Sequence, residues 1–237
     1  MSPRVTCGVA VVTSAMLLSI VLSTEPARAE TLKARFIGNE AFEITDGKVT
    51  LLTDFPYHSG AFGYMKYRFE DVKPTGKVLC LITHRHEDHF NAAPFKKTDW
   101  FLMGPTGRVR GMEPSRIVPL EGLVRFEGIE IRPVKTPHGD LEHYSYWVRW
   151  HGQRLFFSGD TEILDALLGV GKLDVAFVSP WLLESWQATG GPQGVGKVIV
   201  YHHRPDEKIQ PCDVCVVPEQ GDTIEIPYAS AAQTNPH

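Results

Sequence analysis

The stretch LCLITHRHEDHFNAAPF, residues 79–95, constrains this chain more than any other part of its sequence. It packs three histidines and two acids into six consecutive positions, directly after an apolar run typical of a buried strand. Residues two apart on an extended chain face the same side, so His84 and His86 can point toward one divalent ion. Asp88 and His89 follow where the chain turns and offer a second site close by. So many ligands in so short a span favour metal binding over a solvated, histidine-rich loop.

The first 29 residues are typical of a secretory signal peptide. Arg4 lies near the start, an apolar stretch covers residues 9–22, and an Ala-Arg-Ala cleavage site ends at Ala29. The apolar stretch is shorter than the roughly 20 residues that a transmembrane helix needs. We therefore expect cleavage before Glu30, no stable membrane anchor afterwards, and a periplasmic or secreted protein. An uncleaved N-terminal anchor is the alternative.

Residues 30–237 are enough for one domain with a single core. The whole chain has 24 basic and 28 acidic residues and a net charge of -4. Nucleic-acid binding requires a basic surface, so this balance disfavours a nucleic-acid partner. The sequence does not determine the oligomeric state.

Three cysteines remain after cleavage of the signal, too few for a disulfide scaffold. Cys80 lies within an apolar run, which predicts a buried thiol. Cys212 and Cys215 form a C-x-x-C motif, for which a disulfide, a redox pair and half of a zinc site are the alternatives. The βαβ context of a thioredoxin-like motif is absent from the pattern, which favours a structural or adventitious pair.

Short β-like runs separated by Gly, Pro and Asp dominate the chain after the signal. They predict strands over residues 32–37, 41–45, 49–53, 78–83, 100–103, 116–119, 123–126, 129–135, 145–150, 154–158, 175–179 and 197–201. Helices are predicted over residues 162–168, 89–95 and 181–186, the first of them most clearly. Many strands and few helices indicate an α+β sandwich of two packed sheets with helices outside. Residues 235–237 are expected to be a disordered tail.

Residues 83–89, THRHEDH, resemble the T-H-x-H-x-D-H signature of the metallo-β-lactamase superfamily. The family pattern continues with a single histidine, a Gly-Asp after a strand, and a last histidine after another strand. His138 in TPHGD, Asp160 in FFSGDTE and His202 in VIVYHHRP match these in order. The resemblance covers roughly residues 32–205 and implies a four-layer αββα sandwich of two mixed β-sheets.

The resemblance also implies two metal ions. Their ligands would be His84, His86 and His138 for one ion, Asp88, His89 and His202 for the other, and Asp160 as a bridge. Such imidazole and carboxylate ligands suit Zn²⁺, two per chain, with manganese or iron as alternatives.

Three of these assignments have competitors in the sequence. His143 and His151 compete with His138, which alone lies in a Pro-His-Gly loop at the end of a predicted strand. His203 competes with its neighbour His202. Asp160 is also suited to cap the helix predicted from residue 162.

Two adjacent ions lower the pKa of a shared water toward about 7, so a hydroxide exists at neutral pH. That hydroxide can attack the carbonyl or phosphoryl centre of a small-molecule substrate, with Asp88 orienting it and later returning a proton. Asp54 is the candidate to hold a ligating imidazole; a turn-forming role is the alternative. The expected enzyme is an exported metallohydrolase of an ester, lactone, thioester, phosphodiester or amide bond.

A true β-lactamase is less expected. One large group of β-lactamases has Cys at the position of Asp160, and others lack the bridging carboxylate. Export and the acidic balance disfavour relatives that process RNA. Relatives that use iron for redox work would need a partner domain or flavin site, for which the sequence shows no pattern. A non-catalytic metal-binding or interaction protein that retains the fold is the alternative to an enzyme.

Two aromatic segments are candidates for substrate contact. Residues 54–69, DFPYHSGAFGYMKYRF, form either a mobile apolar lid or ordinary core packing with one irregular turn. Residues 181–186, WLLESW, form either a second wall of the site or a buried helix.

Overall fold

The computed structural model describes residues 30–105, 109–169 and 171–229. The expected signal peptide and the expected disordered tail lie outside these residues. Within the described part of the chain, no helix has the length and apolar character needed to cross a bilayer.

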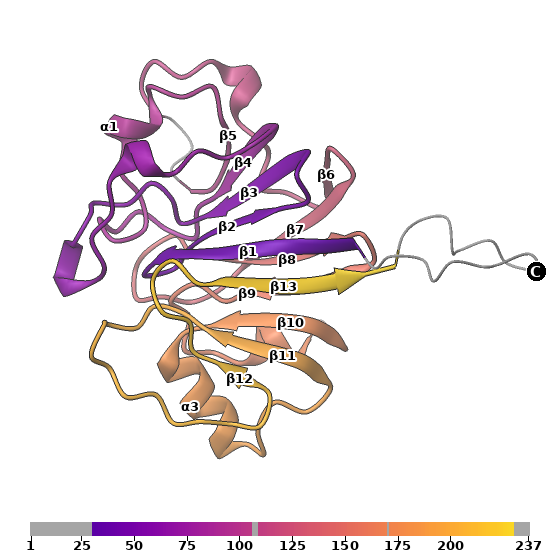
Figure 1. The fold of residues 1–237 in the computed structure, drawn as a ribbon. Coiled ribbons are helices and arrows are strands. Elements are labelled where there is room, and N and C mark those ends of the chain that lie inside the picture. The colour runs from indigo at the N-terminus through magenta and orange to yellow at the C-terminus, as the bar shows by residue number, and fades with distance from the viewer. Residues whose placement is uncertain (1–29, 106–108, 170, 230–237) are drawn as a thin grey trace, which may run out of the picture.

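Two β-sheets form the centre of the molecule (Figure 1). The first sheet contains, in spatial order, β13 (Thr223–Tyr228), β1 (Glu30–Gly38), β2 (Ala41–Thr45), β3 (Val49–Thr53), β4 (Lys77–Leu81) and β5 (Phe101–Met103). The second contains β12 (Cys215–Val216), β11 (Val195–Val200), β10 (Leu173–Val178), β9 (Gln153–Phe157), β8 (Tyr144–Trp150), β7 (Ile129–Lys135) and β6 (Val124–Phe126). Both sheets mix parallel and antiparallel pairs.

Helices lie on the outer faces of the two sheets. They are α1 (Ala92–Phe95), α2 (Asp165–Leu168) and α3 (Pro180–Ala188), with 3-10 turns at Ala61–Gly63, Phe69–Asp71 and Pro114–Arg116. Phe95 of α1 joins the apolar cluster outside the first sheet. Leu182, Leu183 and Trp186 of α3 join the one outside the second sheet. These layers confirm the expected sandwich of two mixed sheets.

The strand pattern explains the layering. Along β10, Val175 and Phe177 belong to the cluster between the sheets, whereas Ala176 and Val178 belong to the outer cluster under α3. Successive side chains of a strand point to opposite faces, so an uninterrupted apolar run is buried on both sides. The two sheets therefore pack on one another and each carries a helix outside.

Most predicted strands are present within one to three residues of their expected ends. The strand predicted over residues 116–119 is wrong: residues Pro114–Arg116 form a 3-10 turn, and Ile117 makes only an isolated bridge to Leu102. Prolines 114 and 119 lack the backbone donor that a strand needs there. The edge strands β12 and β13 were not predicted, since β12 is two residues long and β13 contains a proline.

The helix predictions were right in place but not in length. The helix α2 begins at Asp165 rather than at residue 162, and α3 is the longest described helix, with Pro180 in its first turn. Cys212 and Cys215 form a disulfide next to β12. Cys80 is fully buried, as expected.

Candidate metal centre

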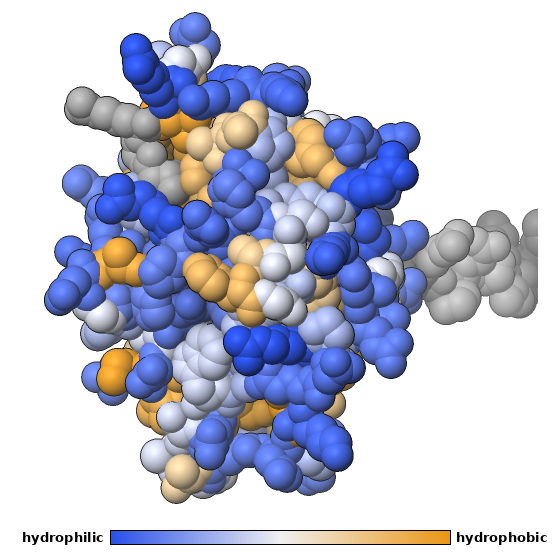
Figure 2. Space-filling model, turned by 90° about the vertical axis from the view of Figure 1, so that its left-hand side faces the viewer, coloured by the Kyte–Doolittle hydropathy of each residue, from blue (hydrophilic) through white to orange (hydrophobic). Residues whose placement is uncertain are grey.

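Four strands end at one edge of the sandwich, and the candidate ligands follow them. His84 comes after β4, His138 after β7, Asp160 after β9 and His202 after β11. The strand β4 is parallel to β3, and β9, β10 and β11 are parallel to one another. Polar residues that follow parallel strands meet at the same edge of a sheet. Figure 2 views the molecule from this side, where a few apolar patches stand among hydrophilic residues.

The first cluster consists of His84, His86, His138 and Asp160, whose ligand atoms lie within 4.8 Å of one another. The Nε2 of His84 is 2.8 Å from the Nδ1 of His86. The Oδ2 of Asp160 is 3.6 Å from the Nε2 of His84 and 3.8 Å from that of His138. The structure therefore brings together the three histidines that the resemblance assigns to one ion and Asp160, which it assigns as the bridge.

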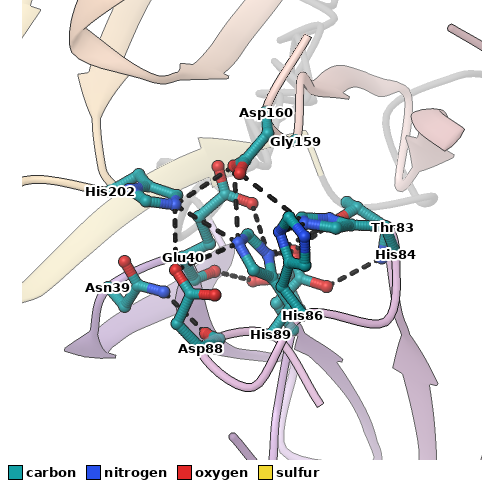
Figure 3. Close-up of polar contacts among 12 residues, drawn as sticks. Asn39, Glu40, Thr83, His84, His86, Asp88, His89, Gly159, Asp160 and His202 are labelled. Atoms are coloured by element: carbon teal, nitrogen blue, oxygen red, sulfur yellow. Dashed lines mark hydrogen bonds and ion pairs between the residues drawn. The ribbon is translucent and has the colours of Figure 1, made fainter. Parts of the chain in front are cut away.

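The second cluster consists of Asp88, His89 and His202, again with ligand atoms within 4.8 Å of one another. The chain turns directly after His86, because the amides of His89 and Phe90 both donate to its carbonyl. This turn separates Asp88 and His89 from the first pair. The Nε2 atoms of His89 and His202 are 3.2 Å apart, across the two sheets (Figure 3).

Asp160 lies between the clusters. Its Oδ2 faces the first cluster, while its Oδ1 is 3.1 Å from the Nε2 of His202 and 3.4 Å from that of His89. A carboxylate with one oxygen toward each group has the geometry of a bridge. The alternative role as a helix cap does not apply, since α2 begins five residues later.

His143 holds Asp160 in place, a role that the sequence did not reveal. Its Nε2 accepts a hydrogen bond from the Asp160 amide at 2.9 Å, and its Nδ1 is 2.7 Å from the Thr136 hydroxyl. Gly159 has φ +62°, and a Cβ there would lie 2.4 Å from the His143 ring. Burial lowers the pKa of His143 to about 4, so the ring is neutral and can accept this bond.

Asp54 contacts the outer nitrogen of His89, as expected for a group that orients a ligand. Its Oδ2 is 3.2 Å from the Nδ1 of His89. The amide and hydroxyl of Thr83 donate to the same carboxylate at 2.7 and 2.9 Å. Asp54 thus fixes the ring of His89 against the end of β4.

The turn between β1 and β2 supplies two further polar residues that sequence reasoning missed. The side-chain amide of Asn39 donates to the backbone carbonyl of Asp88 at 2.6 Å, and the backbone carbonyl of Asn39 accepts from the His202 amide at 2.7 Å. Glu40 is fully buried, with Oε2 3.3 Å from the Nδ1 of His89. The only signal in the sequence is a pair of polar residues between two apolar strands.

Unlike His143, the other two competing histidines, His203 and His151, lie away from the clusters. His203 has its ring nitrogens 3.1 Å from the carbonyls of Arg204 and Pro218, away from both clusters. His151 pairs with Asp46 at 2.8 Å on another surface and stacks on Tyr228. The left-handed backbone of His202, φ 54°, turns that ring inward.

Carboxylates dominate the electrostatics of the second cluster. Burial alone would lower the pKa of His202, but Asp160 and Asp88 raise it to about 10. Burial raises the pKa of Glu40 well above its usual value. Burial would also raise the pKa of Asp160, yet His89 and His202 hold it well below its ordinary range.

Several buried polar atoms of the clusters have no hydrogen-bond partner among the described residues. They are both carboxylate oxygens of Glu40, Oδ1 of Asp88, Oδ1 of Asp160 and Nδ1 of His202. Buried polar atoms in native proteins are normally satisfied. Unpartnered oxygens grouped with imidazole nitrogens form a donor set that fits divalent cations.

A hollow of about 360 Å³ opens over the clusters. Its outer walls are Phe62, Tyr64, Glu162 and Trp181. The Tyr64 and Trp181 rings meet His202 edge-on, with centroids 4.6 and 4.8 Å away. The indole N–H of Trp181 donates to the carbonyl of Asp160 at 3.3 Å.

Both aromatic segments divide between core and hollow. Phe55 and Tyr57 are fully buried, as core packing requires, whereas Phe62 is 62% exposed at the rim. Trp181 lines the hollow, while Trp186 packs under the second sheet. Mobility of residues 54–69 stays a prediction.

This chain is similar to known proteins. The model of the β-lactamase superfamily domain matches residues 33–179, which include every candidate ligand except His202. A metal-dependent hydrolase of Symbiobacterium thermophilum is 27% identical over 164 residues, 62% of this chain and 70% of that protein.

Solved structures share the fold at low sequence identity. A metallo hydrolase from the archaeon Ignicoccus hospitalis is 18% identical with a TM-score of 0.62, covering 84% of this chain and 100% of that chain. A metallo-β-lactamase fold protein from Bacillus subtilis is 12% identical with a TM-score of 0.58, covering 83% and 99%.

Proposed function

The chain belongs to the β-lactamase superfamily and is a metal-dependent hydrolase, and on that premise we propose that it uses two metal ions to hydrolyse an ester, lactone, thioester, phosphodiester or amide bond. One observation carries this proposal. The carboxylate of Asp160 directs one oxygen to each of two adjoining clusters of metal ligands.

The seven candidate ligands would hold the two ions. They are His84, His86 and His138 in the first cluster, Asp88, His89 and His202 in the second, and Asp160 between them. Such a set suits Zn²⁺, and its carboxylates also suit manganese or iron. Two bound ions would act as Lewis acids and lower the pKa of a water toward about 7.

Asp88 is the proposed catalytic residue. Its Oδ2 is 3.4 Å from the Nε2 of His202, while its Oδ1 has no partner among the described residues. Burial alone would raise its pKa, but His202 and His89 hold the pKa well below the usual range, so the group stays ionised. The ionised carboxylate can therefore accept a hydrogen bond from the attacking water and orient it. The proposed return of a proton to the leaving group requires that bound metal ions, rather than His89 and His202 alone, set the pKa of Asp88 during the reaction.

The hollow favours uncharged substrates that carry an apolar group. Its described lining combines the aromatic residues Phe62, Tyr64 and Trp181 with the acid Glu162, and contains no lysine or arginine. A carboxylate or phosphate on the substrate would find no lysine or arginine in that lining, and Arg204 lies behind the Tyr64 ring, 5.5 Å from its centroid. Among the proposed bonds, this supports neutral esters, lactones and thioesters over phosphodiesters and over β-lactams with their carboxylate.

We place the reaction outside the cytoplasm. Residues 1–29 have the pattern of a cleaved signal peptide, and the remaining chain would act in the periplasm or the medium. Export is tested with the full chain and its Ala29→Arg variant. The N-terminus and the location of the two proteins are compared.

The enzymatic proposal is tested with the metal-loaded protein and its Asp88→Ala variant. We expect hydrolysis of at least one neutral ester, lactone or thioester, loss of activity with a chelator, and recovery with added metal. The variant should lose about 10³-fold or more, because both proton transfer and one ligand are removed. Glu87→Gln, which changes an exposed acid in the same segment, is the matched control.

The alternative is a non-catalytic metal-binding protein that retains the fold. It is favoured if the metal-loaded protein and Asp88→Ala are equally inert toward esters, lactones, thioesters, phosphodiesters and β-lactams. A substrate preference for phosphodiesters would contradict the interpretation of the hollow while leaving the hydrolase intact.

A further inference from the structure

Glu40 is a buried acid at the centre that neither the ligand pattern nor the proposed reaction uses. It lies in the turn between β1 and β2, and the backbone on both sides is held by specific hydrogen bonds. The Thr53 hydroxyl donates to the Glu40 carbonyl at 2.6 Å, and the His202 amide donates to the carbonyl of Asn39 at 2.7 Å. These bonds fix the direction in which the Glu40 side chain leaves the turn.

The Glu40 carboxylate is fully buried, and neither oxygen has a hydrogen-bond donor in the described part of the chain. Its nearest nitrogen is Nδ1 of His89, 3.3 Å from Oε2. That nitrogen also lies 3.2 Å from Asp54, and a single N–H cannot satisfy both acids. Asp54 has two other donors, from Thr83, and Glu40 has none.

A buried carboxylate without a donor or a cation is costly. Glu40, Asp160 and His202 each offer one ligand atom, and these atoms lie within 4.8 Å of one another. Figure 3 shows the Glu40 side chain entering the centre beside His202 and Asp160. A cation bound among these residues would supply the partner that the protein itself does not provide.

We propose that Glu40 is an additional carboxylate ligand of the ion held by Asp88, His89 and His202. This inference rests on the two-ion centre of the proposed function and adds a residue to it. With Asp88 and Asp160, Glu40 gives the second ion three carboxylates beside two imidazoles. Oxygen-rich ligand sets suit manganese and iron better than sets dominated by nitrogen, so this site should be less selective for zinc than the first cluster.

The test measures metal binding rather than catalysis. Glu40→Gln keeps the size of the side chain and removes its charge. We compare the affinities of the wild type and the variant for Mn²⁺ and Zn²⁺ by competition with a chromophoric chelator. The visible bands of the Co²⁺-loaded proteins report the ligands around the ion.

We expect Glu40→Gln to weaken Mn²⁺ binding by about 100-fold, to weaken Zn²⁺ binding less, and to change the position and intensity of the Co²⁺ bands. Two matched variants serve as controls for this measurement. Glu87→Gln alters an exposed acid next to Asp88 and should bind metal as the wild type does. Asp54→Asn alters the other acid at His89 and should weaken Mn²⁺ and Zn²⁺ similarly, with the Co²⁺ bands in place.

The proposal is overturned if Glu40→Gln keeps the Mn²⁺ affinity and Co²⁺ bands of the wild type. It is also overturned if Glu40→Gln matches Asp54→Asn in every measurement, because Glu40 would then only hold His89. If Glu40→Gln does not fold, Glu40→Asp retains the charge but withdraws the carboxylate, and unchanged Co²⁺ bands in that variant overturn the proposal. An inert metal-loaded wild type would contradict the proposed function without affecting these results.

Discussion

The two sheets contribute to the centre in different ways. The first sheet supplies a continuous segment, from Thr83 to His89, at the end of β4. The second sheet supplies three separate residues, His138, Asp160 and His202, each at the end of a different strand. The half of the centre that the first sheet contributes is therefore assembled by the local path of one turn. The half that the second sheet contributes exists only when β7, β9 and β11 are in register.

Hydrogen bonds join the two halves where the ligands lie. The Tyr146 hydroxyl, from β8, donates to the carbonyl of Ile82 at 2.7 Å, and the Tyr144 amide donates to that of Thr83 at 3.0 Å. Across the same boundary, the His202 amide donates to the carbonyl of Asn39 at 2.7 Å. Changes in the second half should therefore prevent the ligands from converging, while changes in the first should remove single ligands from an intact turn.

The largest effect is expected from Asp160→Ala, which removes the contact shared by both halves. Loss of a bridging carboxylate should release at least one ion and lower kcat/KM by about 10³-fold or more. Metal content by mass spectrometry and kinetics on the best ester substrate measure this. Asp165→Ala, an exposed acid at the start of α2, is the control. Two bound ions and wild-type activity in Asp160→Ala would show that the halves do not depend on this residue.

The adjacent pair His202 and His203 tests whether strand register selects the ligand. His202→Gln should lose one ion and about 100-fold in activity, because the Nε2 of His202 lies 3.2 Å from the Nε2 of His89, beside the same proposed ion. His203→Gln should retain both ions and lose only about 1 kcal/mol of stability with its bond to Pro218. Metal content and thermal unfolding separate the two, and the reverse pattern would mean that the register is shifted by one residue.

His143 tests the support of the second half. Its pKa of about 4 in the folded protein lies below the ordinary value of 6.5, so the neutral ring contributes stability above pH 6.5 that is lost as the pH falls toward 4. His143→Gln should lack this dependence. In metal-free samples, the free energy of unfolding of the wild type should fall by up to about 3 kcal/mol more than that of the variant as the pH falls from 6.5 toward 4.

Unfolding by denaturant at pH 7.0 and pH 4.5 provides the measurement for His143. The variant should also bind metal about 10-fold more weakly at neutral pH, because Asp160 loses its amide partner. Parallel pH profiles for the two proteins would contradict the assignment of a buried, neutral ring.

The smallest effect is expected at the rim. Phe62→Ala removes an exposed ring from the wall contributed by the first sheet, and kcat/KM for a substrate with an apolar group should fall by about 3- to 10-fold. Phe62→Leu should retain most of this activity. A substrate without the apolar group should be unaffected by either change, and an equal loss for both substrates would show that the ring has a structural role.

The family, the two-sheet architecture and the segment that begins the centre could all be predicted from the amino-acid sequence. Alternating and continuous apolar runs encode strands locally, and the spacing of residues 84–89 encodes one turn with ligands on two sides. Position at the end of a predicted strand also favoured His138 and His202 over their neighbours, and the structure places both rings in the centre.

Only the tertiary structure decided which distant groups meet. The positioning role of His143 and the entry of Glu40 depend on how β8 and the turn between β1 and β2 pack beside β9 and β11. The edge strands β12 and β13 likewise depend on partners that lie far along the chain. Local pattern fixes what each segment can form, but burial of an acid or neutrality of a histidine is a property of the packed neighbours, which no short stretch of sequence contains.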